Sequence, residues 1–267
     1  MSAQSGARAP PPPRIRIGTA GWGNPRHERD LRPPARSHLE HYAACFNCVE
    51  INSSFYRLHH CKTYERWAAS TGLNFRFCVK IPKIISHDSA LRGCRDELDA
   101  FVGSVRGLGS KLALLLLQLP PQVEWHPGVV RRFVALLRNR IEVPVVCEAR
   151  HPSWSGAGAV RLLTQFGISV VSAHPVRLPR NWTLPGGIRY YRLHGSPRVY
   201  WSSYSEGCLQ GLAERIAAER DVFSQVWCIF DNTAAGAAWV NAHLLHRKLR
   251  SGEKQPLVSL ARRGPDR

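Results

Sequence analysis

The sequence contains no apolar run long enough to cross a membrane. A bilayer-spanning helix needs about 20 consecutive apolar residues, and every apolar run in these 267 residues is shorter. The first residues, MSAQSGARAPPPPR, also lack the apolar stretch of a secretory signal. These two absences predict a soluble cytoplasmic protein that makes no use of a membrane.

Cysteine is present, but not at the spacing of a zinc site. Cys45 and Cys48 form one close pair, CFNC, and no second pair stands at zinc-finger distance from it. Cys78, Cys147 and Cys228 lie inside apolar, strand-like runs, where free thiols pack as small hydrophobic groups. Buried free thiols are therefore favoured, with redox or metal use of CFNC as the alternative.

Signature motifs of several enzyme classes are missing. The first apolar run is followed by IGTAGW, which is not GxGxxG, and no GxxxxGK[ST] occurs. GxSxG, HExxH and an EF-hand loop are also absent. These absences argue against dinucleotide-binding and P-loop sites, hydrolases with a nucleophile elbow, and metalloproteases of the HExxH type.

Acidic residues are scarce. The chain has 19 Asp and Glu against 37 Lys and Arg, a formal net charge of +18. Such an excess favours an anionic partner. Both end segments, 1–14 and 251–267, are basic, and their composition predicts disorder. Nonspecific attraction of nucleic acid is expected from this charge, and specific nucleic-acid binding stays open beside it.

Eight short apolar runs, bounded by turn residues, predict strands at 14–22, 48–56, 75–82, 112–121, 143–152, 168–175, 188–195 and 226–233. Apolar spacings of three and four predict helices at 38–46, 63–70, 94–108, 128–139, 158–166, 208–220 and 237–249. This alternation predicts one α/β domain, a (β/α)8 TIM-like barrel over residues 15–250. Residues 175–187 hold three prolines and two glycines, so the sixth crossover is predicted to be a loop instead of a helix.

Polar side chains stand at the C-terminal ends of the predicted strands, the edge at which TIM barrels carry their active sites. The stretch VVCEARHPSW illustrates this, because three ionisable residues follow a buried run. Residues two apart share a strand face. The pairs on one face are Glu148 with Arg150, Arg192 with His194, and Glu50 with Asn52. Alternation alone leaves open which parity faces the barrel interior.

Seven stretches resemble, in order, the motifs of the YecE-like family, a domain of unknown function: GTAGW, VEINSSFYRL, FCVKIPKIISHD, LLLLQLPP, CEARHPSW, YYRLHG and FDNTAAGAAWVNA. The resemblance runs from about Ile15 to about Leu249. It implies a TIM-like barrel and no particular reaction; the likeness to endonuclease IV and xylose isomerase is one of fold. The strand-end positions that match the family are Glu50, Asn52, Lys80, Gln118, Glu148, Arg150, His151, Arg192, His194 and Asn232. The sixth strand departs from it, because VVSAHP lacks the acidic residue that relatives often carry.

These positions suit an anionic ligand better than a metal cluster. Arg150 and Arg192 can each present a fork to phosphate or carboxylate, and Lys80 adds a point charge. The stretch LHGSP adds backbone N–H groups and Ser196 near the usual barrel phosphate position. Cations this close to the carboxylates oppose a multinuclear metal site. No metal ligands are assigned, the cofactor is unknown, and a single divalent metal is an alternative that is not favoured.

Three catalytic residues are assigned: Glu50 and Glu148 as general acid and base, and His194 as a group that moves protons. One alternative is a structural ion network in which Glu50 pairs with Lys80, and Glu148 with an arginine. Another is a Schiff base between Lys80 and a carbonyl substrate.

Loop aromatics after the predicted strands either stack on a ligand or pack as lids. The leading hypothesis is a nucleic-acid-binding or phosphoester-processing protein. Its ligand-binding residues are Asn52, Lys80, Gln118, Arg150, His151, Arg192, Ser196 and Asn232. The alternatives are an isomerase, lyase or hydrolase acting on a phosphorylated or acidic sugar, and a noncatalytic binding module. The sequence predicts no oligomeric state.

Overall fold

The computed structural model describes residues 15–23, 37–176 and 187–252. Within these ranges eight parallel strands are hydrogen-bonded in the order β1-β8-β7-β6-β5-β4-β3-β2. They are β1 (Ile15–Thr19), β2 (Cys48–Ile51), β3 (Arg76–Lys80), β4 (Leu112–Gln118), β5 (Val145–Glu148), β6 (Ser169–His174), β7 (Ile188–Leu193) and β8 (Gln225–Phe230). The eight predicted strands are thereby confirmed, in the arrangement of a TIM-like barrel.

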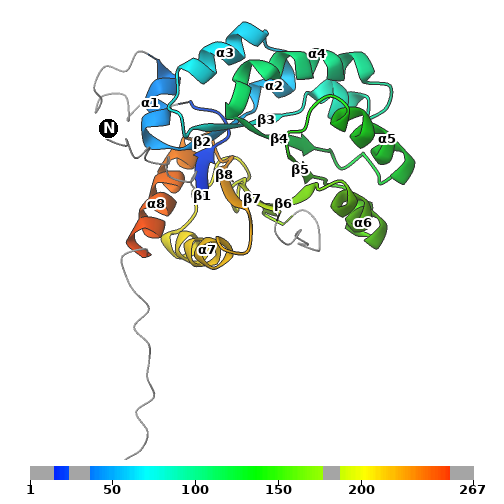
Figure 1. Ribbon diagram of the computed structural model, residues 1–267. Coiled ribbons are helices and arrows are strands. Elements are labelled where there is room, and N and C mark those ends of the chain that lie inside the picture. Colours follow the sequence, from blue (N-terminus) through cyan, green and yellow to red (C-terminus); the bar gives the residue numbers. More distant parts are fainter. Residues whose placement is uncertain (1–14, 24–36, 177–186, 253–267) are drawn as a thin grey trace, which may run out of the picture.

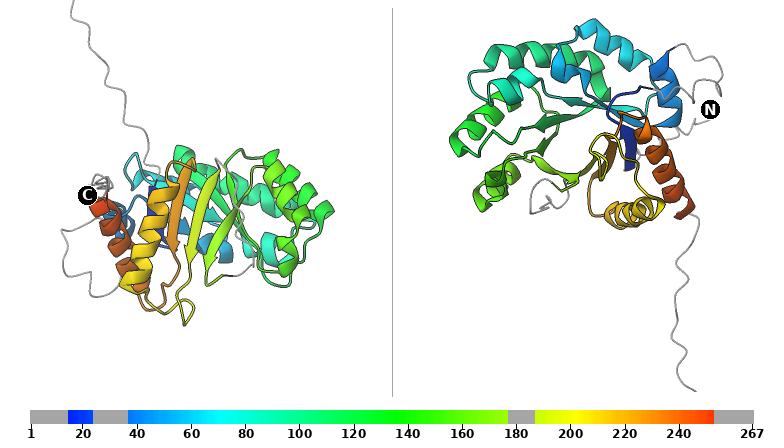
Figure 2. Two further views of the ribbon diagram at one scale, coloured as in Figure 1. Left: turned by 90° about the horizontal axis from the view of Figure 1, so that it is seen from below. Right: turned by 180° about the vertical axis from the view of Figure 1, so that it is seen from behind.

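The two ends of this sheet, β1 and β2, meet at their C-terminal ends. Ala20 forms a parallel bridge with Glu50, and the Gly21 amide donates a hydrogen bond to the Glu50 carbonyl at 2.8 Å. Figures 1 and 2 show the strands curving round to bring these two together. This contact closes the ring of strands.

Helices follow most strands and cover the outside of the ring (Figures 1 and 2). They are α1 (His38–Cys45), α3 (Cys61–Ala69), α4 (Arg95–Val105), α5 (Pro127–Arg138), α6 (Ala157–Gln165), α7 (Glu206–Glu219) and α8 (Ala237–Gly252). Each overlaps a predicted helix. The predicted sixth-crossover loop falls largely on 177–186, outside the described residues. Of the predicted end segments, 1–14 and 251–267, the structure describes only residues 251 and 252, which belong to α8 and are not disordered. No helix in the described ranges has both the length and the apolar character needed to span a bilayer.

Alternation along the strands divides the core in two. The barrel interior is filled by Cys48, Cys78, Leu114, Leu116, Val146, Val171, Tyr190, Trp227 and Ile229. Strand residues of the opposite parity pack with the apolar faces of the helices in a larger cluster. The interior parity continues, at the C-terminal strand ends, into Glu50, Lys80, Gln118, Glu148 and Arg192.

The second strand is shorter than predicted. It ends at Ile51, and Ser53–Tyr56 forms a short helix, α2, where the sequence pattern predicted more strand. The Ser54 hydroxyl lies within hydrogen-bond distance of the carbonyl oxygens of Ile51, at 3.0 Å, and Lys80, at 2.7 Å. A serine that bonds to nearby backbone competes with extended structure. The resulting turn brings Phe55 against Lys80 at the barrel mouth.

None of the eight cysteines, all of which the structure describes, is part of a disulfide. Cys78, Cys147 and Cys228 are buried in strands, as predicted, and Cys48 of the CFNC pair is buried as well. Burial raises the pKa of the Cys48 thiol. The protonated thiol behaves as a small apolar group of the barrel interior.

Candidate functional site at the barrel mouth

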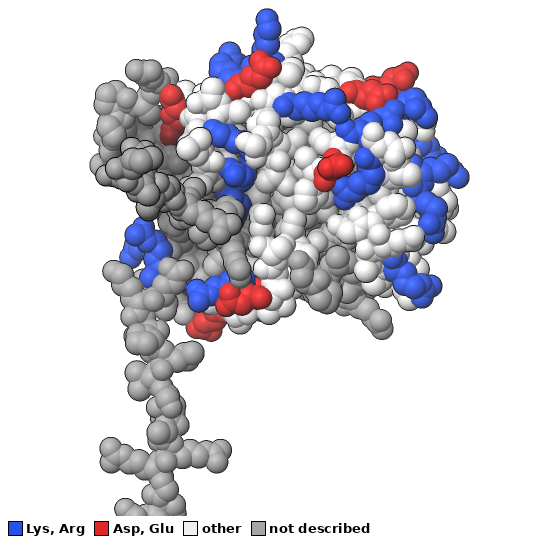
Figure 3. Space-filling view, in the orientation of Figure 1, with Lys and Arg blue, Asp and Glu red and all other residues white. Residues whose placement is uncertain are grey.

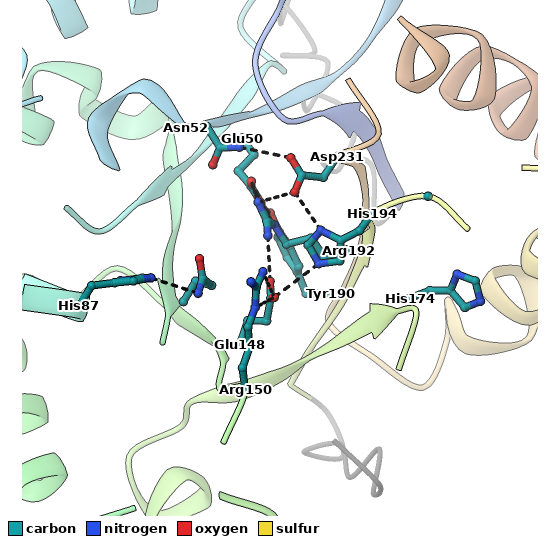
Figure 4. Close-up of polar contacts among 12 residues, drawn as sticks. Glu50, Asn52, His87, Glu148, Arg150, His174, Tyr190, Arg192, His194 and Asp231 are labelled. Carbon is teal, nitrogen blue, oxygen red and sulfur yellow. Dashed lines mark hydrogen bonds and ion pairs between the residues drawn. The ribbon is translucent and has the colours of Figure 1, made fainter. Parts of the chain in front are cut away.

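β7 supplies the centre of the mouth. Arg192 and His194 stand two residues apart on its interior face, and both are buried. Figure 4 shows Arg192 between the carboxylates of Glu50 and Asp231 on one side and Glu148 on the other. These carboxylates come from β2, from the residue after β8 and from β5. Only the closed ring of strands brings them together.

The Arg192 guanidinium is enclosed by carboxylates. Its Nη2 donates to Glu50 Oε1 at 2.8 Å and its Nη1 to Glu148 Oε2 at 3.0 Å. Nη2 also pairs with Asp231 Oδ2 at 3.0 Å, and Nε donates to Glu50 Oε2 at 3.1 Å. The Tyr190 hydroxyl adds a hydrogen bond to Glu50 at 2.7 Å. A charge at this depth is stable only with such partners, and they leave Arg192 little donor capacity for a ligand.

His194 links two of these carboxylates. Its Nδ1 donates to Asp231 Oδ2 at 2.9 Å, and its Nε2 lies 3.4 Å from Glu148 Oε1. Burial would lower the pKa of His194, but these two neighbours outweigh burial and raise it. Burial would raise the pKa of Glu148, but Arg192 and His194 hold it well below its ordinary value. The same balance lowers the pKa of Asp231. The pairing therefore favours the ionised forms of Glu148, Asp231 and His194.

Arg150 follows β5 and reaches toward solvent. Its Nε and Nη2 both contact Glu148 Oε1, at 2.9 Å and 2.8 Å. The Arg150 side chain is 20% exposed, whereas that of Glu148 is fully buried. The Tyr200 phenol lies close to the guanidinium. Arg150 thus uses one edge of its fork on the network and keeps further N–H groups for a ligand.

Lys80, the last residue of β3, carries the unpaired charge of the mouth. Among the described residues no carboxylate oxygen lies within the 4.0 Å of an ion pair from its Nζ. Nζ instead lies 3.9 Å from the centre of the Phe55 ring, and the residue is 8% exposed. Burial, together with the charge of Arg192, lowers the pKa of Lys80 to about 8 against the opposing effect of the carboxylates. An ammonium group held this way is costly without a counter-ion.

His87 is neutral beside these cations. The Ser86 hydroxyl donates to the Pro82 carbonyl at 3.0 Å, so it accepts from His87 Nδ1, 2.8 Å away. His87 Nε2 then accepts a hydrogen bond from the Gln118 amide at 3.4 Å. Burial and the neighbouring positive charges lower the pKa of His87 to about 4. Gln118 and His87 therefore offer the mouth polar groups without charge.

Two predicted ligand-binding residues lie at the rim and are not part of the network. His151 Nδ1 accepts from the Ser153 amide at 3.2 Å, and its Nε2 lies 3.9 Å from Glu124. Ser196 is half-buried in the loop after β7. The amide of the neighbouring Gly195 was among the backbone N–H groups predicted to bind phosphate. It donates a hydrogen bond to the Tyr204 hydroxyl instead, at 2.8 Å.

Asn52 and Asn232 are closer to the network. Asn52 Nδ2 donates to Asp231 Oδ1 at 3.4 Å. Asn232 Nδ2 holds the loop after β7 by donating to the Ser202 carbonyl at 2.9 Å. The Oδ1 atoms of both asparagines are buried without a hydrogen-bond partner in the described part of the chain. Asn52 therefore keeps an unused acceptor beside Asp231, while Asn232 acts on the loop.

Two residues of the network, Tyr190 and Asp231, are missing from the predicted site residues. Tyr190 stands two residues before Arg192, so the period of two in YYRLHG was the signal that placed it on the interior face. Asp231 directly follows the apolar run of β8. Its position at a strand end was the corresponding signal.

Of the predicted loop aromatics, Trp22 is half-buried and packs edge-on against Trp67, and the others divide into two groups. Phe55, Trp154 and Tyr204 are buried, and Trp154 Nε1 donates to the Val123 carbonyl at 2.9 Å. The exposed ones are Tyr56, Tyr200 and Trp201, at 81%, 41% and 46%. Packing accounts for the first group, and only the second offers ring faces to a ligand.

The carboxylates of the mouth are already paired with arginine side chains. In the described ranges no three or more His, Cys, Asp or Glu side chains are arranged to hold a metal ion. Arg192 and Arg150 already occupy oxygens of Glu50, Glu148 and Asp231. A metal would have to displace them against their own positive charge.

Solved structures share this architecture. A DUF72 family protein from Thermotoga maritima MSB8 has a TM-score of 0.75 at 23% identity, covering 88% of this chain and 99% of that chain. A DUF72 family protein from Enterococcus faecalis V583 has a TM-score of 0.74 at 19% identity, covering 88% and 95%. These likenesses support the TIM-like barrel fold and carry no statement about activity.

Curated relatives are similar in sequence. UPF0759 protein YecE of Escherichia coli (strain K12) is 32% identical over 180 residues, which are 62% of each chain. UPF0759 protein YunF of Bacillus subtilis (strain 168) is 28% identical over 148 residues, 52% of each. The match thus spans less than two thirds of these relatives' length. The sequence profile described as "Protein of unknown function DUF72" matches residues 16–265. The chain therefore belongs to the DUF72 family, which confirms the resemblance of its motifs.

Proposed function

We propose that the barrel mouth binds a small anionic ligand that carries a carboxylate or phosphate group. The observation that carries this proposal is the ammonium group of Lys80, which is recessed and has no carboxylate partner among the described residues. Arg150 stands at the same mouth with N–H groups to spare. An anion between the two would supply the counter-charge that Lys80 lacks.

The buried network around Arg192 lies deeper in the barrel than this proposed ligand site and forms its charged base. Glu50, Glu148 and His194 are at most 1% exposed, and their polar atoms face Arg150, Arg192, Tyr190, Asp231 or one another. A general acid or base must reach the substrate proton, so the predicted catalytic roles of these three are not favoured. Their charges instead hold Arg150 in place and oppose a second anion at depth.

Thermal unfolding of the full chain tests the proposal. Inorganic phosphate, malonate and sugar phosphates are titrated, and saturable stabilisation by at least one is expected, because a ligand that binds only the native state raises its stability. Lys80→Met should abolish the effect, and Arg150→Gln should weaken it. Lys83→Met is the matched control, since Lys83 is half-exposed and paired with Asp88 at 2.6 Å. Equal stabilisation of all the proteins, or of none, would contradict the proposal.

Nucleic-acid binding is a second candidate, supported by charge on the outer surface. Residues 1–14 and 253–267 hold six basic and two acidic residues, so fourteen of the eighteen net charges belong to residues 15–252. Exposed arginines include Arg131 and Arg132 of α5 and Arg161 of α6. Figure 3 shows Lys and Arg gathered along the upper right and right edges of the molecule. Such a surface favours phosphate backbones without base-specific contacts.

A further inference from the structure

Lys80 differs from Arg150 and Arg192 in having no ion-pair partner among the residues that the structure describes. The carboxylates within its electrostatic reach are Glu50, Glu148 and Asp231. All three are bonded to Arg192, and Glu148 also to Arg150. Nζ lies over the Phe55 ring, 3.9 Å from its centre. The amine is therefore positioned by packing and is not consumed by an ion pair.

We infer that Lys80 is a nucleophile that forms a Schiff base with a small aldehyde or ketone bearing a carboxylate or phosphate group. This inference rests on the proposed function. Arg150 holds the anionic group, and the carbonyl carbon approaches Nζ of Lys80 at the C-terminal end of β3. The barrel's ligand-binding edge is where such a lysine meets its substrate.

The reaction balances without any co-reactant. The lone pair of the neutral amine forms a bond to the carbonyl carbon, and a proton passes from nitrogen to oxygen to give a carbinolamine. Loss of the hydroxyl group with the second nitrogen proton releases one water and leaves a C=N bond to Lys80. Nothing is oxidised or reduced.

The surroundings of Lys80 increase the fraction of neutral amine, although the ammonium form still predominates at pH 7. Burial and Arg192 lower its pKa to about 8, while Glu50, Glu148 and Asp231 oppose this. His87, also within electrostatic reach of Lys80, is neutral and adds no charge. Compared with a lysine in water, Lys80 has roughly 200- to 300-fold more free amine at neutral pH. The amine is thus available where an unburied lysine is almost wholly protonated.

Reductive trapping on the full chain tests the inference. The protein is incubated at pH 7.5 with pyruvate or with dihydroxyacetone phosphate, which separate carboxylate from phosphate recognition, and is then treated with borohydride. Peptide mapping covers the six lysines, which are Lys62, Lys80, Lys83, Lys111, Lys248 and Lys254. We expect the adduct at Lys80 to exceed that at any other lysine by about tenfold or more, as its larger free-amine fraction requires.

The controls separate this inference from anion binding. Lys80→Met should lose the adduct and Lys83→Met should keep it; mapping of the unaltered protein decides the question if Lys80→Met does not fold. Lactate and glycerol 3-phosphate carry the same anions without the carbonyl group. If they stabilise the protein but neither carbonyl probe labels Lys80, the Schiff base is overturned and the anion site stands. If no probe binds and no adduct forms, both are overturned.

Discussion

Two buried cations of the same barrel mouth have pKa values shifted in opposite directions. Arg192 is 1% exposed and Lys80 8%. Burial would lower the pKa of both, yet the carboxylates around Arg192 raise its pKa well above the ordinary value, and Lys80 falls to about 8. The difference lies in the partners, since Arg192 has three carboxylates at contact distance. Arg192 should therefore stabilise the fold, and Lys80 should cost stability.

Arg192→Met is expected to destabilise the protein by about 3–5 kcal/mol, because it leaves buried carboxylates without their counter-charge. Urea unfolding at pH 7 measures this. Arg192 and His194 hold the pKa of Glu148 below its ordinary value. The wild type therefore loses the stability that the ionised Glu148 contributes as the pH falls through this lowered pKa. The difference in unfolding free energy between the wild type and Arg192→Met should accordingly become smaller in acid. Arg161→Met, an exposed change on α6, should stay within about 0.5 kcal/mol. Similar losses in both variants would refute the structural role of Arg192.

Lys80→Met is expected to stabilise the protein by about 1–3 kcal/mol at pH 7. Between the folded pKa of about 8 and the ordinary 10.5, the unfolded chain holds a proton that the native state has lost. The wild type therefore gains stability as the pH rises through this window. The difference in unfolding free energy by which Lys80→Met exceeds the wild type should consequently be smaller at pH 10 than at pH 7. Thermal unfolding at pH 7 and 10 checks this, with Lys83→Met as a control. A loss of stability at pH 7 would show that Lys80 is a structural residue.

At the scale of the elements, β1 and β2 approach each other closely at Gly18. A Cβ at Gly18 would lie 2.2 Å from the Cys48 carbonyl oxygen and 2.9 Å from the Tyr42 hydroxyl. Tyr42, from α1, accepts a hydrogen bond from the Thr19 amide at 2.7 Å and donates one to the Cys48 carbonyl at 2.9 Å. This tyrosine thus ties the two strands whose contact closes the ring.

Gly18→Ala should destabilise the protein by about 1–3 kcal/mol, because the methyl group meets backbone that has no room to move. Gly211→Ala, within α7, meets nothing within 4 Å and should stabilise by about 0.5–1 kcal/mol through helix propensity. Chemical unfolding of the two variants measures the sign of each change in unfolding free energy. Equal stability of the two variants would mean that the strands can separate at Gly18 without cost.

Within single elements, sequence reasoning succeeded where periodicity was strong. The long apolar stripe of α5 and the apolar run of β4 were placed within a few residues. Sequence reasoning failed at α2, because the pattern of VEINSSFYRL predicts that the strand continues through these residues. The Ser54 hydroxyl and the neighbouring strand end at Lys80 decide that turn, and no local pattern contains the second of these.

At the scale of the whole molecule, the excess positive charge belongs mainly to the barrel. The mouth itself is nearly balanced, because Glu50, Glu148 and Asp231 face the cations there. Arginines with exposed side chains lie on the outer helices, among them Arg131 and Arg132 of α5 and Arg161 of α6. A polyanion should therefore bind the outside, and a small anion the mouth, as two separable activities.

Single-stranded oligonucleotides should bind with an affinity that falls steeply between 50 and 200 mM salt, as contacts to phosphates require. A chain of residues 15–252 should keep most of this affinity, because it keeps fourteen of the eighteen charges. Fluorescence anisotropy measures both. Lys80→Met should leave the binding unchanged, whereas Arg131→Gln with Arg132→Gln should weaken it. Binding lost on trimming would assign it to the end segments.

Local pattern alone determined the repeating strands and helices, the barrel they form, and the polar positions at the strand ends, because periods of two and about 3.6 are readable within one segment. Which parity faces inward and which charges pair were decided only by the tertiary structure. Glu50 and Arg192, 142 residues apart, meet because the ring closes. From the sequence alone, Glu50 could pair with Lys80 on the next strand. In the barrel Glu50 pairs with Arg192 instead, and Lys80 has no ion-pair partner among the described residues. Pairing depends on distances across the barrel, which no neighbouring residues encode.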